Sequence, residues 1–261
     1  MNRTSKVFVA GHQGMVGSAI MRELASKGYE NIVTATHGEL DLTNQNRVVK
    51  FFRAKRPDVV VDCAAKVGGI HANNTYRADF IYNNLQIQNN LIHSSYEFEV
   101  EKLLFLGSSC IYPKFADQPI KEEYLLASPL ESTNEPYSVS KIAGIKMCES
   151  YFKQYDCDFI SVMPCNQYGP NDNFHPKNSH VLPALLRRFH EAKVNEEETV
   201  EVWGTGKAKR EFLHVDDLAS ACVFLLEKVN SSEIYEKNIS HLNIGSGEEI
   251  SIAGLAKLIA E

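Results

Sequence analysis

The sequence predicts an α/β fold, a Rossmann-type doubly wound parallel sheet with a smaller C-terminal lobe. Short apolar runs alternate with helical patterns over residues 1–165, and the first run passes directly into a glycine-rich turn. Reactive polar residues follow several of these runs, at the sheet edge where open α/β folds bind their ligands. The pattern becomes looser after residue 165, which predicts a separate lobe beside the main domain.

The glycine turn lies near the N-terminus, between a predicted strand at residues 6–10 and a predicted helix that stops at Gly28. Gly11 allows a tight turn, Gly14 lets the backbone approach a pyrophosphate, and Gly17 allows the helix to pack closely on the strand. The spacing is Gly-x-x-Gly-x-x-Gly, which departs from the usual Gly-x-Gly-x-x-Gly. We therefore predict that a dinucleotide binds at this turn and at the helix N-terminus.

The end of the second predicted strand, at residues 31–36, normally selects the nicotinamide cofactor. An acidic residue there binds the ribose 2′-hydroxyl of NAD, whereas an arginine accepts the 2′-phosphate of NADP. This chain has His37 at that point and Gln13 in the glycine turn, while Glu39 and Asp41 come slightly later. The residues themselves leave the choice of cofactor open.

The remaining elements alternate as a parallel sheet requires. Helices are expected at residues 47–55, 78–96 and 137–155, and strands at residues 57–64, 102–107 and 158–163. Residues 65–75 are expected to form a glycine-containing loop, and residues 111–133 an irregular segment. The second half predicts a helix at 181–193, a strand at 199–203, a helix ending near Val229 that is capped by Asp216 or Asp217, and a last helix from Ser251.

Tyr137 and Lys141 are four residues apart at the start of a predicted helix, so they share one helical face. A fixed ammonium group stabilises a phenolate and lowers the pKa of the phenol from about 10 toward neutrality. The preceding strand brings Ser108 and Cys110 to the same edge of the sheet. Tyr137 could then protonate a ketone whose oxygen Ser108 holds; the alternative is an ordinary amphipathic helix with an exposed Tyr and Lys.

Composition excludes several classes of function. The 261 residues are 44% hydrophobic, which is enough for a large core, and the net charge of −6 gives no reason to expect nucleic acid or an anionic membrane as a partner. No apolar run is long enough to span a membrane. The six cysteines include no Cys-x-x-Cys pair, so no disulfide framework and no metal site is expected. Because the N-terminus lacks the apolar core of a secretory signal, we expect a cytoplasmic protein.

Six motifs together resemble the GDP-L-fucose synthase family of extended short-chain dehydrogenases/reductases. They are Gly-His-Gln-Gly-Met-Val-Gly-Ser at 11–18, Ala-Lys-Val-Gly-Gly-Ile at 65–70, Gly-Ser-Ser-Cys-Ile-Tyr-Pro at 107–113, Asn-Glu-Pro-Tyr at 134–137, Asn-Phe-His-Pro-Lys-Asn-Ser-His at 173–180 and Arg-Glu-Phe-Leu-His-Val-Asp-Asp at 210–217. Such enzymes convert GDP-4-keto-6-deoxy-D-mannose to GDP-L-fucose by epimerising carbons 3 and 5 and reducing the 4-ketone with NADPH. The resemblance therefore implies an NADPH-dependent oxidoreductase with epimerase activity.

The resemblance also implies roles for individual residues. Ser108, Tyr137 and Lys141 would form the reductase triad, and Cys110 and His180 the epimerase pair. The GDP-sugar would lie on Arg188, Trp203 and Arg210. NADP(H) would be bound by Gly11, His12, Gln13, Gly14, Met15, Val16, Gly17, His37, Asp41, Leu42, Leu106, Gly107, Lys141, Pro164, Asn166 and His180.

Each of these roles has a plainer alternative. Cys110 could be a buried hydrophobic residue, His180 could cap the helix that it precedes, and Trp203 could belong to the core. Arg188 and Arg210 could be solvated charges, although a diphosphate ligand favours guanidinium groups.

Two departures from the family pattern affect these expectations. Relatives usually have arginine where this chain has Gln13 and His37, so we expect only a modest preference for NADPH over NADH. The sequence ends at Glu261, shortly after the last helix begins, whereas relatives continue. We expect an NADP-binding domain at residues 1–165, to which 210–245 contribute, and a substrate lobe at 166–261 that is truncated.

Other functions are left open by the sequence. The chain could be a different NAD(P)-dependent sugar-nucleotide enzyme, a 4-epimerase or a 4,6-dehydratase, or a catalytically impaired homologue that binds cofactor. A dehydratase would be expected to have an acidic pair after the triad serine, where this chain has Ser109, Cys110 and Ile111. A homodimer that pairs through the helices at 78–96 and 141–155 is expected from the resemblance.

Overall fold

Six parallel strands form the central sheet of the computed structural model, which describes residues 1–176 and 178–261. The strand order is β2-β1-β3-β4-β5-β8. Their bounds are β1 Val7–Ala10, β2 Ile32–Val33, β3 Val59–Asp62, β4 Lys102–Leu106, β5 Phe159–Pro164 and β8 Leu242–Ile244. This confirms the predicted Rossmann-type sheet, with a sixth strand contributed by the second half of the chain.

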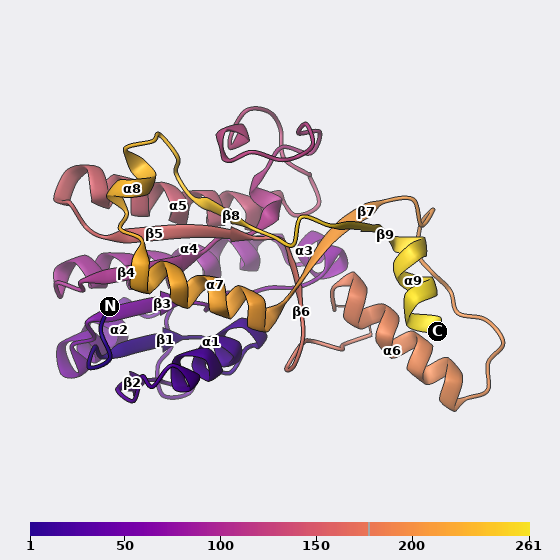
Figure 1. Ribbon diagram of the computed structural model, residues 1–261, viewed down its shortest axis with the longest axis horizontal. Helices are drawn as coiled ribbons and strands as arrows, with labels where there is room; N and C mark the ends of the chain where they lie inside the picture. Colours follow the sequence, from indigo (N-terminus) through magenta and orange to yellow (C-terminus); the bar gives the residue numbers. More distant parts are fainter. Residues whose placement is uncertain (177) are drawn as a thin grey trace.

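Helices cover both faces of the sheet (Figure 1). Helices α1 (Met15–Ser26) and α7 (Val215–Lys228) pack on one face, and α2 (Gln45–Lys55), α4 (Arg77–Glu97) and α5 (Glu135–Tyr155) on the other. Short helices lie in the connections: α3 (Ile70–Thr75), α8 (Ser232–Tyr235), η1 (Ser109–Ile111) and η2 (Glu122–Tyr124). Because both faces are covered, strands β1, β3, β4 and β5 consist entirely of buried residues.

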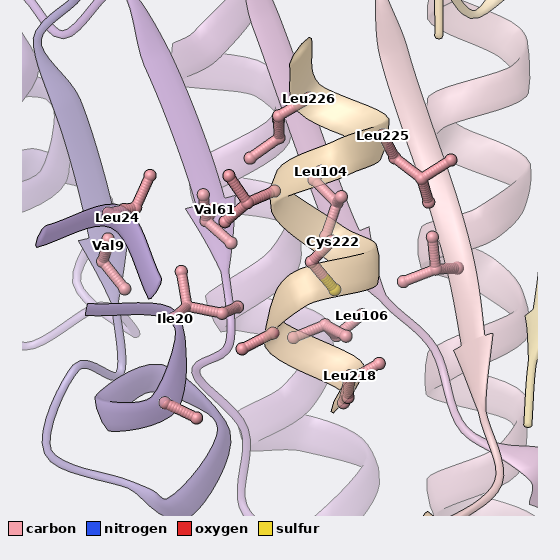
Figure 2. Close-up of a cluster of buried hydrophobic side chains, with 14 of the residues drawn as sticks. Val9, Ile20, Leu24, Val61, Leu104, Leu106, Leu218, Cys222, Leu225 and Leu226 are labelled. Carbon is pink, nitrogen blue, oxygen red and sulfur yellow. The ribbon is translucent and has the colours of Figure 1, made fainter. Parts of the chain in front are cut away.

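The two cores follow from the alternation of side chains along each strand. Val59 and Val61 of β3 point to the α1/α7 face, whereas Val60 points to the face of α2, α4 and α5. Figure 2 shows the first of these cores, in which α1 and α7 meet the sheet through Val9, Ile20, Leu24, Val61, Leu104, Leu106, Leu218, Cys222, Leu225 and Leu226.

A smaller lobe extends from one end of the sheet (Figure 1). Its three-stranded sheet has the order β6-β7-β9, formed by Asn166–Tyr168, Lys209–His214 and Glu249–Ser251. Helices α6 (Val181–Val194) and α9 (Ile252–Ala260) pack together through a third apolar cluster that includes Leu182, Leu185 and Leu255. The side chain of Ser251 caps α9 by accepting a 3.0 Å hydrogen bond from the backbone N–H of Gly254.

Three local predictions were wrong. Residues 199–203, all of them described, form no strand; the strand is Lys209–His214, because that segment finds partners in both β6 and β9. Part of the loop predicted at residues 65–75 is helical, since α3 spans Ile70–Thr75. Helix α7 is capped by His214, whose side chain accepts a hydrogen bond from the backbone N–H of Asp216; the two aspartates lie in the first turn.

Candidate active site

One cleft of about 1540 Å³ runs from the glycine turn, across the carboxyl ends of β3, β4 and β5, to the smaller lobe. It is lined by residues from both halves of the chain. Every site residue predicted from the sequence lies on its wall: Gly11, His12, Gln13, Gly14, Met15, Val16, Gly17, His37, Asp41, Leu42, Leu106, Gly107, Ser108, Cys110, Tyr137, Lys141, Pro164, Asn166, His180, Arg188, Trp203 and Arg210. The fold thus brings together all of the candidate residues, whose individual roles stay predictions.

The glycine turn is built by close backbone contacts. Gly11 has a φ of +78°, and a Cβ there would lie 2.9 Å from backbone atoms of Ala64. A Cβ on Gly17 would lie 2.2 Å from the carbonyl oxygen of Gly11, so only glycine lets α1 start this close to β1. Gly14 differs, because a Cβ there would meet only the Gly11 oxygen, at 3.4 Å. A Cβ at Gly14 would therefore fit beside the backbone, and because Gly14 lines the cleft, a larger side chain there would occupy space in it.

The corner of the cleft beyond β2 is lined by both polar and apolar side chains. Among the described residues that line this corner there is no arginine. Gln13 and His37 are both exposed there. Asp41 accepts hydrogen bonds from the backbone N–H and the hydroxyl of Thr43, at 2.9 and 2.7 Å, and these bonds lower the pKa of its carboxyl group. The Nδ1 atom of His12 is buried and has no hydrogen-bond partner in the described part of the chain.

Arg47 of α2 lies beside this corner but is already used to hold the loop after β2. Its Nη2 atom donates hydrogen bonds to the carbonyl oxygens of Gly38 and Glu39, at 3.2 and 2.8 Å. These two bonds direct the Nη2 atom of Arg47 to the loop.

Lys141 lies one turn after Tyr137 on α5, as predicted, and its ammonium group is buried. The side chain is 4% exposed, and its Nζ atom donates a 2.8 Å hydrogen bond to the carbonyl oxygen of Leu106. The same atom lies 4.7 Å from the ring centroid of Phe105 and 6.0 Å from that of Tyr137. Burial lowers the pKa of Lys141, and the carboxyl group of Asp62 is the strongest opposing influence.

The phenol of Tyr137 does not have the lowered pKa that the sequence predicted. Burial raises its pKa well above the usual value, the thiol of Cys110 raises it further, and the hydroxyl of Ser108 opposes the rise. The edge of Tyr137 packs against the ring of Phe80, at 6.2 Å between centroids. The prediction failed because burial of the phenol disfavours its charged form, while the ammonium group lies 6.0 Å from the ring centroid.

Ser108 and Cys110 follow β4 and lie side by side. The thiol of Cys110 donates a 3.2 Å hydrogen bond to the hydroxyl oxygen of Ser108. Burial raises the pKa of the Cys110 thiol, while the hydroxyls of Ser108 and Ser138 and the ammonium of Lys141 oppose that rise. Burial therefore favours the protonated thiol, which is suited to donating a proton.

His180 is the N-cap residue of α6, but its imidazole makes no capping hydrogen bond. The ring is exposed to the cleft, yet the surrounding walls desolvate it enough to lower its pKa, and Asp172 opposes this shift. The segment before it is held by Gly69, whose backbone N–H donates a 2.9 Å hydrogen bond to the carbonyl oxygen of Asn178. Lys177, which belongs to the same sequence motif, lies outside the described residues.

The far end of the cleft belongs to the smaller lobe. Trp203 is 60% exposed, so it is not a core residue, and the guanidinium carbon of Arg188 lies 4.0 Å from its ring centroid. Arg188 also donates a 3.3 Å hydrogen bond to the carbonyl oxygen of Glu201. Arg210 is exposed on β7, and its Nη1 atom donates a 2.7 Å hydrogen bond to the neighbouring carbonyl oxygen of Lys209. Two cations and an aromatic ring are thus available to a ligand.

Three further residues support the site and were missed from the sequence. Asn84 of α4 holds the loop after β3: its Oδ1 atom accepts from the N–H of Lys66 at 2.8 Å, and its Nδ2 atom donates to the Lys66 carbonyl at 3.0 Å. Asp172 interacts with His180, and Asp62 with Lys141. Only Asp62 carried a signal, because an acid at the end of an otherwise apolar strand is unusual.

The described residues contain no group of three or more His, Cys, Asp or Glu side chains that could hold a metal ion. In the same part of the chain, no helix is both long and apolar enough to cross a membrane.

Comparison with known proteins places the chain in a family. Residues 7–245 match the model of the NAD dependent epimerase/dehydratase family. The chain is 63% identical to GDP-L-fucose synthase 1 of Arabidopsis thaliana over 260 residues, which cover 100% of this chain and 78% of that protein. It is 55% identical to GDP-L-fucose synthase of Escherichia coli (strain K12) over 260 residues, or 98% of this chain and 80% of that protein.

A solved structure agrees with this assignment. The GDP-D-glycero-L-gluco-heptose synthase of Campylobacter jejuni, crystallised in the presence of NADPH, superposes with a TM-score of 0.93 at 39% identity, covering 99% of this chain and 85% of that one. The chain therefore belongs to the NAD dependent epimerase/dehydratase family and, within it, to the GDP-L-fucose synthases.

Proposed function

We propose that the protein converts GDP-4-keto-6-deoxy-D-mannose to GDP-L-fucose, by epimerisation at carbons 3 and 5 and NADPH-dependent reduction of the 4-ketone. One observation carries this proposal: Ser108, Tyr137 and Lys141 share a cleft with Cys110 and His180, and that cleft begins at the glycine turn. The names of the relatives in Arabidopsis thaliana and Escherichia coli support the same activity.

The cofactor NADP(H) would lie along the glycine turn and supply a hydride when bound. The turn fits a pyrophosphate because Gly14 has no side chain and stands at the N-terminus of α1, where backbone N–H groups favour anions. Leu106, Gly107, Pro164 and Asn166 line the next part of the cleft, toward Ser108. The unpartnered Nδ1 atom of His12 is a further polar group available at the turn.

Ser108 and Tyr137 would hold the oxygen on carbon 4 in both stages of the reaction. A ketone at carbon 4 acidifies the hydrogens at carbons 3 and 5, because the charge of the resulting enolate rests on that oxygen. The same two hydroxyls then assist reduction, in which Tyr137 donates the proton. Burial raises the pKa of Tyr137, which keeps its phenol protonated at neutral pH.

Cys110 and His180 would exchange protons at carbons 3 and 5. Epimerisation needs a base on one face of the sugar ring and an acid on the other. Burial favours the neutral form of both side chains, since it raises the pKa of the Cys110 thiol and lowers that of the His180 imidazole. A neutral imidazole accepts a proton and a neutral thiol donates one, which supports a base and acid pair.

The smaller lobe, residues 166–261, would hold the GDP part of the substrate. Arg188 and Arg210 provide cations for the diphosphate, and Trp203 provides an exposed aromatic surface for a ring.

We include in this proposal that residues 1–165, together with 210–245, form the cofactor domain. The pairing of β8 with β5 and the packing of α7 beside α1 support that division.

The proposal includes a homodimer formed through α4 and α5. Tyr82 and Val139 on these helices are 62% and 41% exposed, and the helices form a small hollow of about 290 Å³ between them, lined by Arg77, Ala78, Ile81, Glu135, Pro136 and Val139.

A cytoplasmic location is also part of the proposal. All six cysteines are free thiols, as a reducing compartment favours.

The activity is tested by incubating the purified protein with GDP-4-keto-6-deoxy-mannose and NADPH. The expected result is oxidation of NADPH with formation of GDP-L-fucose, identified by proton NMR. A reduced product that keeps the original configuration at carbons 3 and 5 would show a reductase without epimerase activity. No oxidation of NADPH would contradict the proposal.

A further inference from the structure

Strand β3 ends in a buried acid. Asp62 is 1% exposed and follows the fully buried residues Val59, Val60 and Val61. Its Oδ1 atom accepts a 3.1 Å hydrogen bond from the backbone N–H of Ala64, whereas its Oδ2 atom is buried without a hydrogen-bond partner among the described residues. An unsatisfied buried carboxyl oxygen is costly, so its presence calls for an explanation.

The strand register places Asp62 on the same side of the sheet as Lys141. Asp62 pairs with Phe105 of β4, and paired residues of neighbouring strands direct their side chains to the same face. That face is covered by α5, because the Phe105 ring packs so closely on Gly144 that a Cβ there would lie 2.3 Å from it. The Nζ atom of Lys141 lies 4.7 Å from the centroid of the same ring. Both buried ionisable groups are therefore next to Phe105.

The ammonium group of Lys141 has few charged neighbours. The groups that act on it are Asp62 and Cys63 at the end of β3 and Cys110 after β4, and Tyr137 lies on its own helix. Among these, Asp62 supplies the carboxylate. A buried ammonium group without a counter-charge loses its proton readily, because desolvation disfavours the charged form.

We propose that Asp62 is a positioning residue of the reductase site, which keeps Lys141 in the ammonium form and so maintains a positive charge beside Tyr137. This inference rests on the proposed function, whose triad includes Lys141. Burial raises the pKa of Asp62 to about 6, with Lys141 opposing the rise, so the carboxylate is ionised at neutral and alkaline pH. Without that charge, Lys141 deprotonates at a lower pH and Tyr137 loses its positive neighbour.

The chain offers a matched pair of variants. Asp62→Asn keeps the shape of the side chain and removes its charge, and Asp62→Leu also removes the buried polar atoms. Ser161→Ala is the control. Ser161 lies on β5 and pairs with Phe105 across the β4–β5 ladder. It is 1% exposed, and its buried hydroxyl has no hydrogen-bond partner in the described part of the chain. The control thus changes a buried polar atom on the same face without changing any charge.

The first measurement is kcat for reduction between pH 6 and pH 10. For both Asp62 variants the alkaline limb should move about one pH unit lower, as expected for loss of a neighbouring opposite charge, while kcat at pH 6 stays near that of the parent. The ratio of kcat at pH 9 to kcat at pH 7 should fall by up to about tenfold. Ser161→Ala should keep the parent profile. Circular dichroism and NADPH titration check that each variant is folded.

The second measurement follows the ionisation of Lys141 directly, in protein with ¹³C-labelled lysine ε-carbons and without substrate. The resonance is assigned with a Lys141→Arg variant. The pKa of Lys141 should be lower in Asp62→Asn than in the parent and in Ser161→Ala. An unchanged Lys141 titration and an unchanged alkaline limb would overturn the inference. If the parent does not turn over the substrate, the proposed function fails, and the titration still decides the role of Asp62.

Discussion

The Sγ atom of Cys110 donates a 3.2 Å hydrogen bond to the Oγ atom of Ser108. The bond joins the side chain proposed to exchange protons at carbons 3 and 5 to the side chain proposed to hold the oxygen on carbon 4. Because these carbons are neighbours in the sugar ring, the two chemistries need adjacent side chains. This pair meets that requirement.

Replacement of Cys110 by alanine should abolish epimerisation and leave NADPH binding intact. Loss of a general acid or base typically lowers the rate of proton transfer by about 100-fold or more. The measurement is proton NMR of the substrate in deuterated water, which reports uptake of deuterium at carbons 3 and 5. Exchange of both positions at the parent rate would show that Cys110 only packs.

The matched variant for that experiment is Tyr137→Phe. It removes the phenolic hydroxyl and keeps the aromatic edge that packs on Phe80 at 6.2 Å. Reduction should fall by about 100-fold or more, because Tyr137 is the proposed proton donor. Deuterium exchange should slow less, since Ser108 still holds the enolate oxygen. Equal losses of exchange and reduction would contradict this division of labour.

Substitutions at Gly14 and at Gly17 of the glycine turn should have different effects on NADPH binding and on stability. Gly14→Val should lower the melting temperature less than Gly17→Ala does, because a Cβ at Gly14 meets only the Gly11 oxygen, at 3.4 Å, and NADPH binding should weaken at least about tenfold. Gly17→Ala should lower the melting temperature, because its Cβ would lie 2.2 Å from the same oxygen. An unchanged NADPH titration in Gly14→Val would exclude this turn as the cofactor site.

Cofactor preference should respond to His37. The cleft wall there offers Gln13 and His37 to a 2′-phosphate, while the carboxylate of Asp41 interacts with His37 and Arg47 holds the loop. We expect NADPH to be preferred only modestly over NADH. His37→Arg should raise the ratio of kcat/KM for NADPH over NADH about tenfold, as one charge-assisted hydrogen bond does. A large preference in the parent that this variant does not change would contradict the expectation.

Much of the main domain could be predicted from sequence because its signals are local. Apolar runs mark buried parallel strands, and the glycine turn marks the start of α1. The predicted site residues of the main domain lie on one cleft because the carboxyl ends of parallel strands meet at one edge, whereas Arg188, Trp203 and Arg210 reach the same cleft from the smaller lobe. The position of that edge follows from the alternation of strands and helices along the sequence.

The smaller lobe was predicted less well because its strands depend on distant partners. Residues 199–203 have the apolar and β-branched composition of a strand but no pairing, whereas Arg210 lies in a strand because it pairs with Ile250. The pKa of Tyr137 was mispredicted for a related reason. Whether the pKa is raised or lowered depends on how deeply the phenol is buried, and sequence spacing carries no information about that burial.

Asp62 should make folding stability depend on pH. Burial raises its pKa from the ordinary 3.8 to about 6 in the folded protein, so the protonated form stabilises the fold below about pH 4 and that contribution is lost as pH rises toward 6. The difference corresponds to about 3 kcal/mol at about 1.4 kcal/mol per pKa unit. Asp62→Asn should therefore raise the free energy of unfolding by up to about 3 kcal/mol at pH 8 and by little at pH 4.

Urea denaturation of the parent, Asp62→Asn and Ser161→Ala at pH 4, 6 and 8 measures this difference. Ser161→Ala should change stability by the same amount at all three values, since it alters no ionisable group. The Asp62→Asn variant should therefore be more stable at pH 8 and should also show the shifted alkaline limb of kcat. Both effects have one cause, because the carboxylate charge that destabilises the fold also keeps Lys141 protonated. If the effect of Asp62→Asn on stability does not depend on pH, the pKa of this carboxyl group is the same in the folded and unfolded states. That result would contradict the effect expected from its burial.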